Sequence, residues 1–276
     1  MKKFLIHFLR SLKPLSTKHY LWPIFTHSRS FDFKKYYKSS KVRVNLGAGP
    51  YFICNDWISI DLGTKSNPSK NYFIKNFTYK NLDLNNFKDF DLKKIDICYA
   101  SHFFEHLNAK ELELLLFNIR NIFNENGVIR IVVPDADLII NRLKNNDLEY
   151  FLPIKPALSK YNIKYNKLNI FYFLLNLSAL MGFENMNIDE KMLNKYSPQK
   201  LITMLNKNSR ARINNADGSM HLIALNYKTL KRFLINAGFK NVQKSAFMQS
   251  KVGEMRETPI FDGTHPWLSL YVEAET

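Results

Sequence analysis

The stretch Val42–Pro50, VRVNLGAGP, and the stretch Trp57–Asp61, WISID, decide how this chain is organised. A short β-branched run ends in Gly47 and Gly49, and a second short apolar run ends in Asp61. Glycine has no Cβ, so the backbone at both glycines can turn tightly after a strand and approach a ligand closely. An acid at the end of the next strand can accept hydrogen bonds from the two hydroxyls of a ribose. Together these features predict a nucleoside site at the carboxyl ends of parallel strands.

The third glycine of a dinucleotide-binding site is missing from this stretch. Pro50 directly follows Gly49, and Tyr51 stands at the second position after that glycine. A pyrophosphate bound at a helix N-terminus is therefore disfavoured. A nucleoside ligand without phosphates fits better, although a lone Gly-x-Gly also occurs in ordinary strand-to-helix turns.

Several segments together carry a resemblance to a known family. They are Asn45–Gly49 (NLGAG), Asp61, Asn81–Leu84 (NLDL), Ile95–His102 (IDICYASH) and Gly127–Asp135 (GVIRIVVPD). Their order and spacing resemble a class I S-adenosylmethionine-dependent methyltransferase, over about residues 42–140 and 216–276. More narrowly, Ser101–Leu107 (SHFFEHL) and Leu268–Ala274 (LSLYVEA) are similar to predicted methyltransferases associated with bacterial surface-polysaccharide synthesis.

The resemblance implies an α/β, Rossmann-like class I methyltransferase fold, with a mostly parallel seven-stranded sheet and an antiparallel edge strand. The alternation of strand and helix patterns agrees with a parallel sheet. We expect strands near residues 42–46, 57–61, 71–75, 95–100, 127–133, 239–248 and 267–274. We expect helices over 102–124, from Asp135 onward, and within 226–239.

By the same resemblance, the implied cofactor is S-adenosylmethionine and its binding residues follow the strand ends. These residues are Asn45, Gly47, Ala48, Gly49, Asp61, Leu62, Asp83, Leu84 and Ser101. The two glycines would line the methionine part of the cofactor, Asp61 would bind the ribose hydroxyls, and Asp83 would contact the adenine amine. Asn45 stands where the family often has an acid that holds the cofactor's amino group.

Methyl transfer to a hydroxyl requires an acceptor oxygen in line with the methyl group and a base that removes its proton. The candidate catalytic residues are His102, Glu105 and His221, and His106 is a further candidate base. A neutral imidazole suits proton removal from a sugar hydroxyl near neutral pH. The sequence leaves the choice among them open.

The run from His102 to His106, HFFEH, also matches the H-x-x-E-H signature of inverted zinc proteases. A hydrolytic zinc site would need a third ligand and an open position for water. His102 is predicted to lie at a strand-to-helix junction, so the two imidazoles need not share one helical face. The neighbouring segments already account for a nucleoside site, and we therefore expect no metal ion.

Positive charge is concentrated outside the predicted cofactor domain. Residues 1–41 hold ten Lys or Arg and one acid, and residues 141–215 hold twelve Lys or Arg and five acids. The net charge of the whole chain is +16. We divide the chain into a basic N-terminal arm (1–41), a methyltransferase domain (42–140 and 216–276) and a helical insertion (141–215). Such clustering favours a polyanion or an anionic membrane near these segments, or it reflects lysine-rich solvated surfaces.

The arm and the insertion each allow two interpretations. On a helix, residues 1–15 place Phe4, Leu5, Phe8, Leu9, Leu12 and Leu15 on one side. This basic amphipathic helix would lie on an anionic membrane or pack on the domain. The run Ile170–Phe183 is nearly all apolar but too short to span a bilayer. It predicts a helix that covers the substrate pocket, or one that forms a dimer.

These observations favour an O-methyltransferase that acts on a sugar hydroxyl of a surface glycan or its precursor. The two cysteines form no metal or disulfide pattern, so we expect a cytoplasmic protein. Binding of the basic arm to an anionic membrane would place the protein at the inner face of that membrane. An RNA methyltransferase is an alternative because of the charge, but the chain lacks a motif for base amines, and nucleic acid is disfavoured as a partner. A non-catalytic methyltransferase-fold scaffold at the membrane is the remaining alternative.

Overall fold

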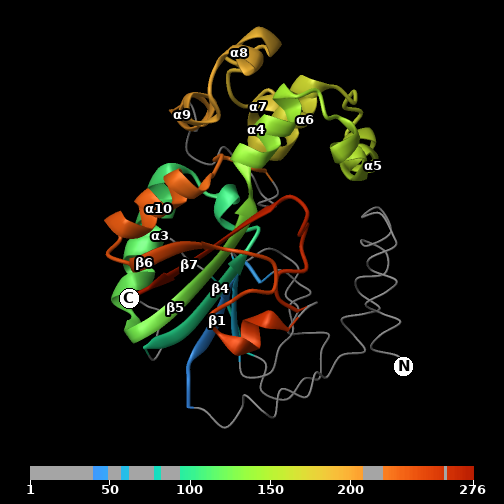
Figure 1. Cartoon of the computed structure of the whole chain (residues 1–276). Coiled ribbons are helices and arrows are strands. Elements are labelled where there is room, and N and C mark those ends of the chain that lie inside the picture. The colour runs from blue at the N-terminus through green and yellow to red at the C-terminus, as the bar shows by residue number, and fades with distance from the viewer. Residues whose placement is uncertain (1–39, 49–56, 62–77, 82–93, 208–219, 258–259) are drawn as a thin grey trace, which may run out of the picture.

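The computed structural model describes residues 40–48, 57–61, 78–81, 94–207, 220–257 and 260–276. These residues form a seven-stranded sheet in the order β3-β2-β1-β4-β5-β7-β6 (Figure 1). The strands are β1 (Arg43–Leu46), β2 (Trp57–Asp61), β3 (Thr78–Asn81), β4 (Ile95–Ser101), β5 (Phe123–Pro134), β6 (Lys240–Ser245) and β7 (Ser269–Glu275). The expected strand at 71–75 lies outside the described residues, and the outer strand that pairs with β2 in the structure is β3.

The order of the strands creates a switch point in the middle of the sheet. The chain runs from β1 outward to β2 and β3, and then continues on the other side of β1 with β4 and β5, all parallel. Open α/β sheets bind ligands beside the carboxyl ends of strands where the order reverses in this way. The expected antiparallel pairing at one edge of the sheet is confirmed, although the strand that is antiparallel to the others is not itself the outermost one. The antiparallel strand β7 lies between β5 and β6, and β6 forms the edge.

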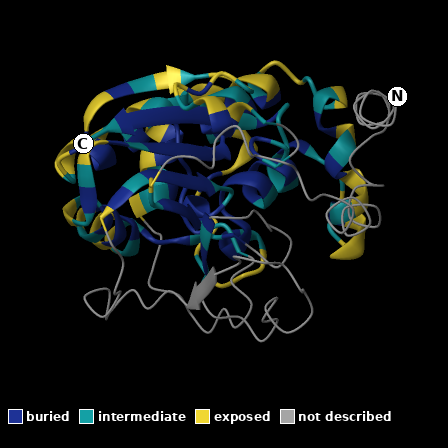
Figure 2. Ribbon diagram, turned by 90° about the horizontal axis from the view of Figure 1, so that it is seen from below, coloured by how far each residue is buried: buried dark blue, intermediate teal, exposed yellow. Residues whose placement is uncertain are grey.

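One face of the sheet is apolar, and the other mixes polar side chains with buried apolar ones such as Trp57 and Val132. One face packs with α3 (Ala109–Asn121) and α10 (Tyr227–Asn236) into a hydrophobic core. These helices lie side by side against the strands in Figure 1. The other face carries Asn45, Ser59 and Tyr99, because the register aligns Asn45 with both of the other residues. Figure 2 shows that buried residues lie mainly in the middle of the molecule and exposed residues mainly at its periphery.

The segment after β4 is not the single helix expected over 102–124. A one-turn 3-10 helix, η4 (Phe104–His106), comes first, and α3 begins only after Asn108. The Asn108 side chain accepts hydrogen bonds from the first turn of α3, and the Glu111 carboxylate accepts from the Asn108 backbone N–H, which forms a capping box. At the other end β5 begins at Phe123, earlier than expected, with a register shift opposite Ile95–Ile97.

Residues 136–207 form a helical part whose hydrophobic core also includes Ala224 and Leu268. Its helices are α4 (Ala136–Lys144), η5 (Glu149–Ile154), α5 (Lys155–Lys160), α6 (Lys167–Leu175), α7 (Leu177–Leu180), α8 (Glu190–Lys195) and α9 (Pro198–Lys207). They gather at one end of the sheet in Figure 1. The apolar run 170–183 is not one helix, because the Asn176 side chain accepts a hydrogen bond from the Ala179 N–H and caps a new helix. Whether this part covers a substrate stays a prediction.

The structure does not test the amphipathic helix expected in the N-terminal arm. Residues 1–39 lie outside the described residues, so the amphipathic helix over 1–15 stays a prediction. Within the part of the chain that the structure describes, no helix is long and apolar enough to cross a membrane.

Candidate active site

Polar side chains gather on one face of the sheet at the carboxyl ends of β1, β2 and β4. Asn45 aligns with Ser59 and with Tyr99, and residues two apart on a strand share a face, so Asp61 and Ser101 lie on this face as well. Asn45 and Ser59 are buried, and neither Asn45 Oδ1 nor Ser59 Oγ has a hydrogen-bond partner among the described residues. Buried acceptors without donors are unfavourable, so this edge is suited to a ligand that donates hydrogen bonds.

The turn after β1 requires glycine at its first position. Gly47 has a φ of +65°, and its N–H donates to Ile60 O at 2.8 Å, while the Ala48 N–H donates to the same oxygen at 3.2 Å. A Cβ at Gly47 would lie 2.4 Å from the Phe103 side chain. The tight turn predicted at Gly47 is therefore confirmed, and its contact with a ligand stays a prediction. Four other expected cofactor residues lie outside the described residues: Gly49, Leu62, Asp83 and Leu84.

His102 lies at the junction between β4 and η4, as the sequence analysis expects. Its φ of +51° is uncommon for a residue other than glycine, and such conformations cluster at functional sites. The backbone N–H donates to Val132 O at 2.8 Å. The ring lies between two elements, with Nε2 2.9 Å from Ser269 Oγ and Nδ1 3.1 Å from Glu105 Oε1.

Glu105 is held in the interior by η4 and by a distant segment. Its backbone oxygen accepts hydrogen bonds from the Leu222 N–H at 2.7 Å and from the Ile223 N–H at 3.3 Å. The residue is 2% exposed, and neither carboxylate oxygen makes an aligned hydrogen bond with any described residue. Burial raises the pKa of the Glu105 carboxyl, and the neighbouring imidazoles of His106 and His221 act in the opposite direction.

His106 and His221 face each other beside this carboxylate, with ring centroids 4.9 Å apart. His106 Nδ1 lies 3.0 Å from Met220 O, and His221 Nδ1 lies 2.7 Å from Leu174 O on α6. Burial lowers the pKa of His106 to about 4 and also lowers the pKa of His221. In both imidazoles the lowered pKa favours the neutral form.

The structure brings together all of the expected catalytic residues, although they come from distant parts of the chain. His102 contacts Glu105, and Glu105 lies beside His221 and His106. Sequence reasoning missed Ser269 as the partner of the His102 ring, since no spacing relates residues so far apart. The roles of these side chains in catalysis stay predictions.

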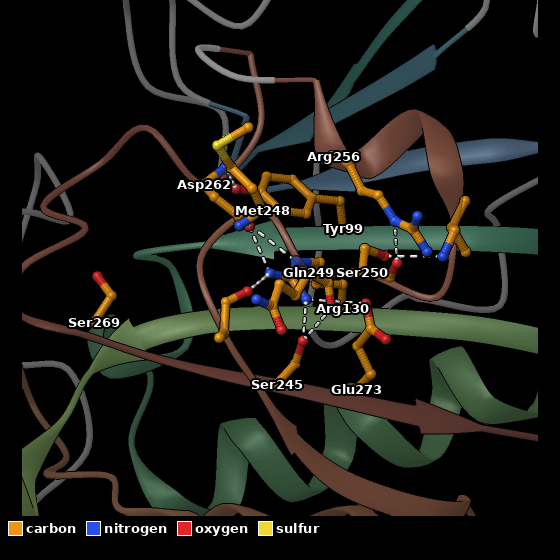
Figure 3. Close-up of polar contacts among 12 residues, drawn as sticks. Tyr99, Arg130, Ser245, Met248, Gln249, Ser250, Arg256, Asp262, Ser269 and Glu273 are labelled. Carbon is orange, nitrogen blue, oxygen red and sulfur yellow. Dashed lines mark hydrogen bonds and ion pairs between the residues drawn. The ribbon is translucent and has the colours of Figure 1, made fainter.

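A second buried cluster, centred on Arg130 of β5, lies on the same face of the sheet as Tyr99 (Figure 3). The guanidinium donates to both carboxylate oxygens of Asp262, to Glu273 Oε1 at 2.9 Å and to Ser245 Oγ at 3.0 Å. The Asp262 N–H donates to Tyr99 Oη at 2.6 Å. This Arg130 cluster joins β4, β5 and β7 to the segment that contains Asp262, and sequence reasoning did not identify it.

No protein-family model matches the sequence, and no curated protein matches it. Solved structures match at low identity. One is human N-acetylserotonin methyltransferase in complex with SAM, at 11% identity and a TM-score of 0.40, over 85% of this chain and 47% of that one. Another is a SAM-dependent methyltransferase from Archaeoglobus fulgidus, at 14% identity and a TM-score of 0.43, over 95% and 98% of the two chains. A third is an O-methyltransferase family protein from Burkholderia thailandensis, at 10% identity and a TM-score of 0.44, over 95% of this chain and 56% of that one.

These neighbours are methyltransferases by their descriptions, and two of the three descriptions name SAM. The chain spans about half the length of the human enzyme and of the CurJ carbon methyltransferase, 47% and 48% respectively. At such identities and TM-scores the likeness assigns neither a residue nor an activity to this chain.

Proposed function

We propose that the chain is an S-adenosylmethionine-dependent methyltransferase whose cofactor site lies at the carboxyl ends of β1, β2 and β4. The observation that carries the proposal is the polar edge formed by Asn45, Ser59, Asp61 and Ser101 on one sheet face beside the switch point. Asn45 Oδ1 is a buried acceptor without a donor among the described residues. The ammonium group of the cofactor's methionine part is a donor of the kind that this oxygen lacks.

Three residues at or beside this edge have separate tasks. Gly47 turns the backbone where a side chain has no room, Asp61 at the end of β2 accepts hydrogen bonds from the ribose hydroxyls, and Ser101 ends β4 between cofactor and acceptor. The bound cofactor supplies a methyl group that its sulfonium has already activated. The chain has to align the acceptor oxygen and take its proton, for which His102, Glu105 and His221 are the candidates.

The acceptor that we propose is a sugar hydroxyl of a surface glycan or of its lipid-linked or nucleotide-linked precursor. The support for it is the narrow sequence resemblance of Ser101–Leu107 and Leu268–Ala274. A second support is the excess of Lys and Arg in residues 141–215, because such precursors carry phosphates that a positive segment attracts.

A thermal-shift measurement with S-adenosylhomocysteine tests the cofactor site. Wild type, Asp61→Ala and the exposed-charge control Glu113→Ala are compared. A ligand at one hundred times its Kd stabilises by about 2.7 kcal/mol. This corresponds to a shift of roughly 5–10 °C at about 2–4 °C per kcal/mol. We expect the shift in wild type and in Glu113→Ala and its loss in Asp61→Ala; a folded wild type without a shift would refute the proposal.

Transfer of a labelled methyl group from S-adenosylmethionine tests the acceptor. Lipid-linked and nucleotide-linked glycan precursors and total RNA are offered separately. Label in the glycan fractions supports a sugar acceptor. Label only in RNA would favour the nucleic-acid alternative and would leave the cofactor site intact.

A further inference from the structure

We propose that Glu105, His106 and His221 form a binding site for a divalent transition-metal ion, with zinc as the reference ion. One ligand atom from each of these side chains lies within 4.8 Å of the other two. Glu105 and His106 come from η4, and His221 comes from the segment before α10. The proposal does not depend on the binding of a cofactor.

The orientation of both imidazoles suits metal binding. A carbonyl oxygen only accepts hydrogen bonds, so Met220 O and Leu174 O place the proton of each ring on Nδ1. In a neutral imidazole of this tautomer the lone pair is on Nε2. Metal-binding histidines typically donate their other ring N–H to a backbone carbonyl or carboxylate, which fixes the ring in the same way.

The Glu105 carboxylate supplies an independent reason for an ion. A carboxylate that is 2% exposed normally accepts several hydrogen bonds, whereas neither oxygen of Glu105 has an aligned partner among the described residues. Its nearest basic group is His102, with Nδ1 3.1 Å from Oε1. A cation bound between Glu105 and the two imidazoles would compensate the negative charge of the Glu105 carboxylate. His102 would then contact that carboxylate and not the ion itself.

The chemistry of the ligands selects the class of ion. Two imidazoles and one carboxylate suit zinc and other first-row transition metals better than magnesium or calcium, which prefer oxygen ligands. Zinc bonds of 2.0–2.1 Å in a tetrahedral site hold ligand atoms about 3.3 Å apart. The ligand atoms of the three side chains lie within 4.8 Å of one another, so metal binding would shorten the distances between them by up to roughly 1.5 Å. Three protein ligands leave one position open for water or a substrate oxygen.

This arrangement differs from the H-x-x-E-H signature considered in the sequence analysis. That signature requires His102 and His106 on one helical face, and the structure has a strand end followed by a single 3-10 turn instead. His221 replaces His102 as the second imidazole. Its position is fixed because the adjoining Leu222 and Ile223 donate to the Glu105 backbone oxygen.

Calorimetric titration of the chelator-treated, full-length protein with Zn²⁺ tests the proposal. We expect one equivalent to bind in wild type, and we expect His106→Gln and His221→Gln to weaken binding by roughly 100-fold or more. Glu105→Gln provides a third variant that keeps the shape of the side chain. Co²⁺ in place of zinc should give the visible absorption of a four-coordinate ion in wild type, which is lost in the same variants.

Two control proteins separate this site from other histidines. His265→Gln removes an imidazole whose ring centroid lies 5.5 Å from that of His102 but which is not part of the cluster. A triple variant replaces His7, His19 and His27 in the N-terminal arm with Gln. Both controls should bind zinc within about threefold of wild type. Absence of stoichiometric binding in wild type, or wild-type affinity in folded His221→Gln and Glu105→Gln proteins, would overturn the proposal.

Discussion

The Arg130 cluster and the Glu105 cluster are both buried and charged, yet they differ in how completely their groups are paired. The Arg130 guanidinium donates to two carboxylates, to a hydroxyl and to Ala246 O. The Glu105 carboxylate accepts no aligned hydrogen bond from any described residue. A satisfied buried network is what a fold requires for its own stability, whereas an unsatisfied buried group calls for a further explanation.

The difference separates a structural role from a binding role. The Arg130 cluster connects strands and a loop, so we expect its loss to appear as lost stability. The Glu105 cluster holds two imidazoles and a buried carboxyl group that has no aligned hydrogen bond among the described residues, so we expect its loss to appear as lost ligand binding. Substitutions in the Arg130 cluster should therefore lower the free energy of unfolding, whereas substitutions of Glu105 should not.

The largest effect is expected for Arg130→Met. This change leaves the Asp262 and Glu273 carboxylates buried without their cation, which costs about 3–5 kcal/mol. The midpoint of urea unfolding should fall accordingly. Adding Asp262→Asn and Glu273→Gln to the variant should recover part of the loss, because the unpaired charges are then gone. A loss below about 1 kcal/mol in the single variant would show that the cluster is not a structural unit.

A matched pair of Glu→Gln changes tests the contrast directly. Glu273 accepts from Arg130 Nη1 at 2.9 Å and from the Lys251 N–H at 3.0 Å, so Glu273→Gln should cost about 1–3 kcal/mol. Glu105→Gln in metal-free protein removes a buried charge that has no aligned partner, so the free energy of unfolding should stay the same or rise. Urea unfolding in the presence of a chelator measures both. A loss of more than about 1 kcal/mol in Glu105→Gln would mean that the carboxylate is structurally paired after all.

Local sequence signals predicted the elements whose boundaries depend on nearby residues. Asp135 after Pro134 begins α4, and Asn226 begins α10, because in each case the side chain caps its own helix. The turn after β1 could also be predicted, because it depends on the local residue Gly47. The Gly47 conformation is set by the residue itself and by its contact with Phe103.

The parts that were not predicted depend on contacts between distant residues. The apolar spacing of 102–124 resembles one helix, but Phe104 and Leu107 are buried by a 3-10 turn before α3 begins. The pairing of His106 with His221 follows from backbone hydrogen bonds to Glu105 O, which no spacing in the sequence indicates. Arg130 likewise lies in the apolar part of β5, Val128–Pro134, and its partners follow more than one hundred positions later.

The smallest effect is expected for Lys251→Ala. This change removes an exposed ion pair next to the Arg130 cluster. The hydrogen bond from the backbone N–H of residue 251 to the Glu273 carboxylate stays in place. Lys251 Nζ lies 2.6 Å from Glu275 Oε1, and the hydrogen bonds from Lys251 and Asn241 lower the pKa of the Glu275 carboxyl. An exposed pair contributes roughly 0.2–1 kcal/mol and less in high salt. Because this pKa is lowered in the folded state, the contribution is present above the ordinary carboxyl pKa of about 4.3 and is lost on further acidification. Urea unfolding at pH 7 and pH 3 should therefore show a small difference between variant and wild type only at pH 7; an equal difference at both values would place the effect in the packing of the lysine stem instead.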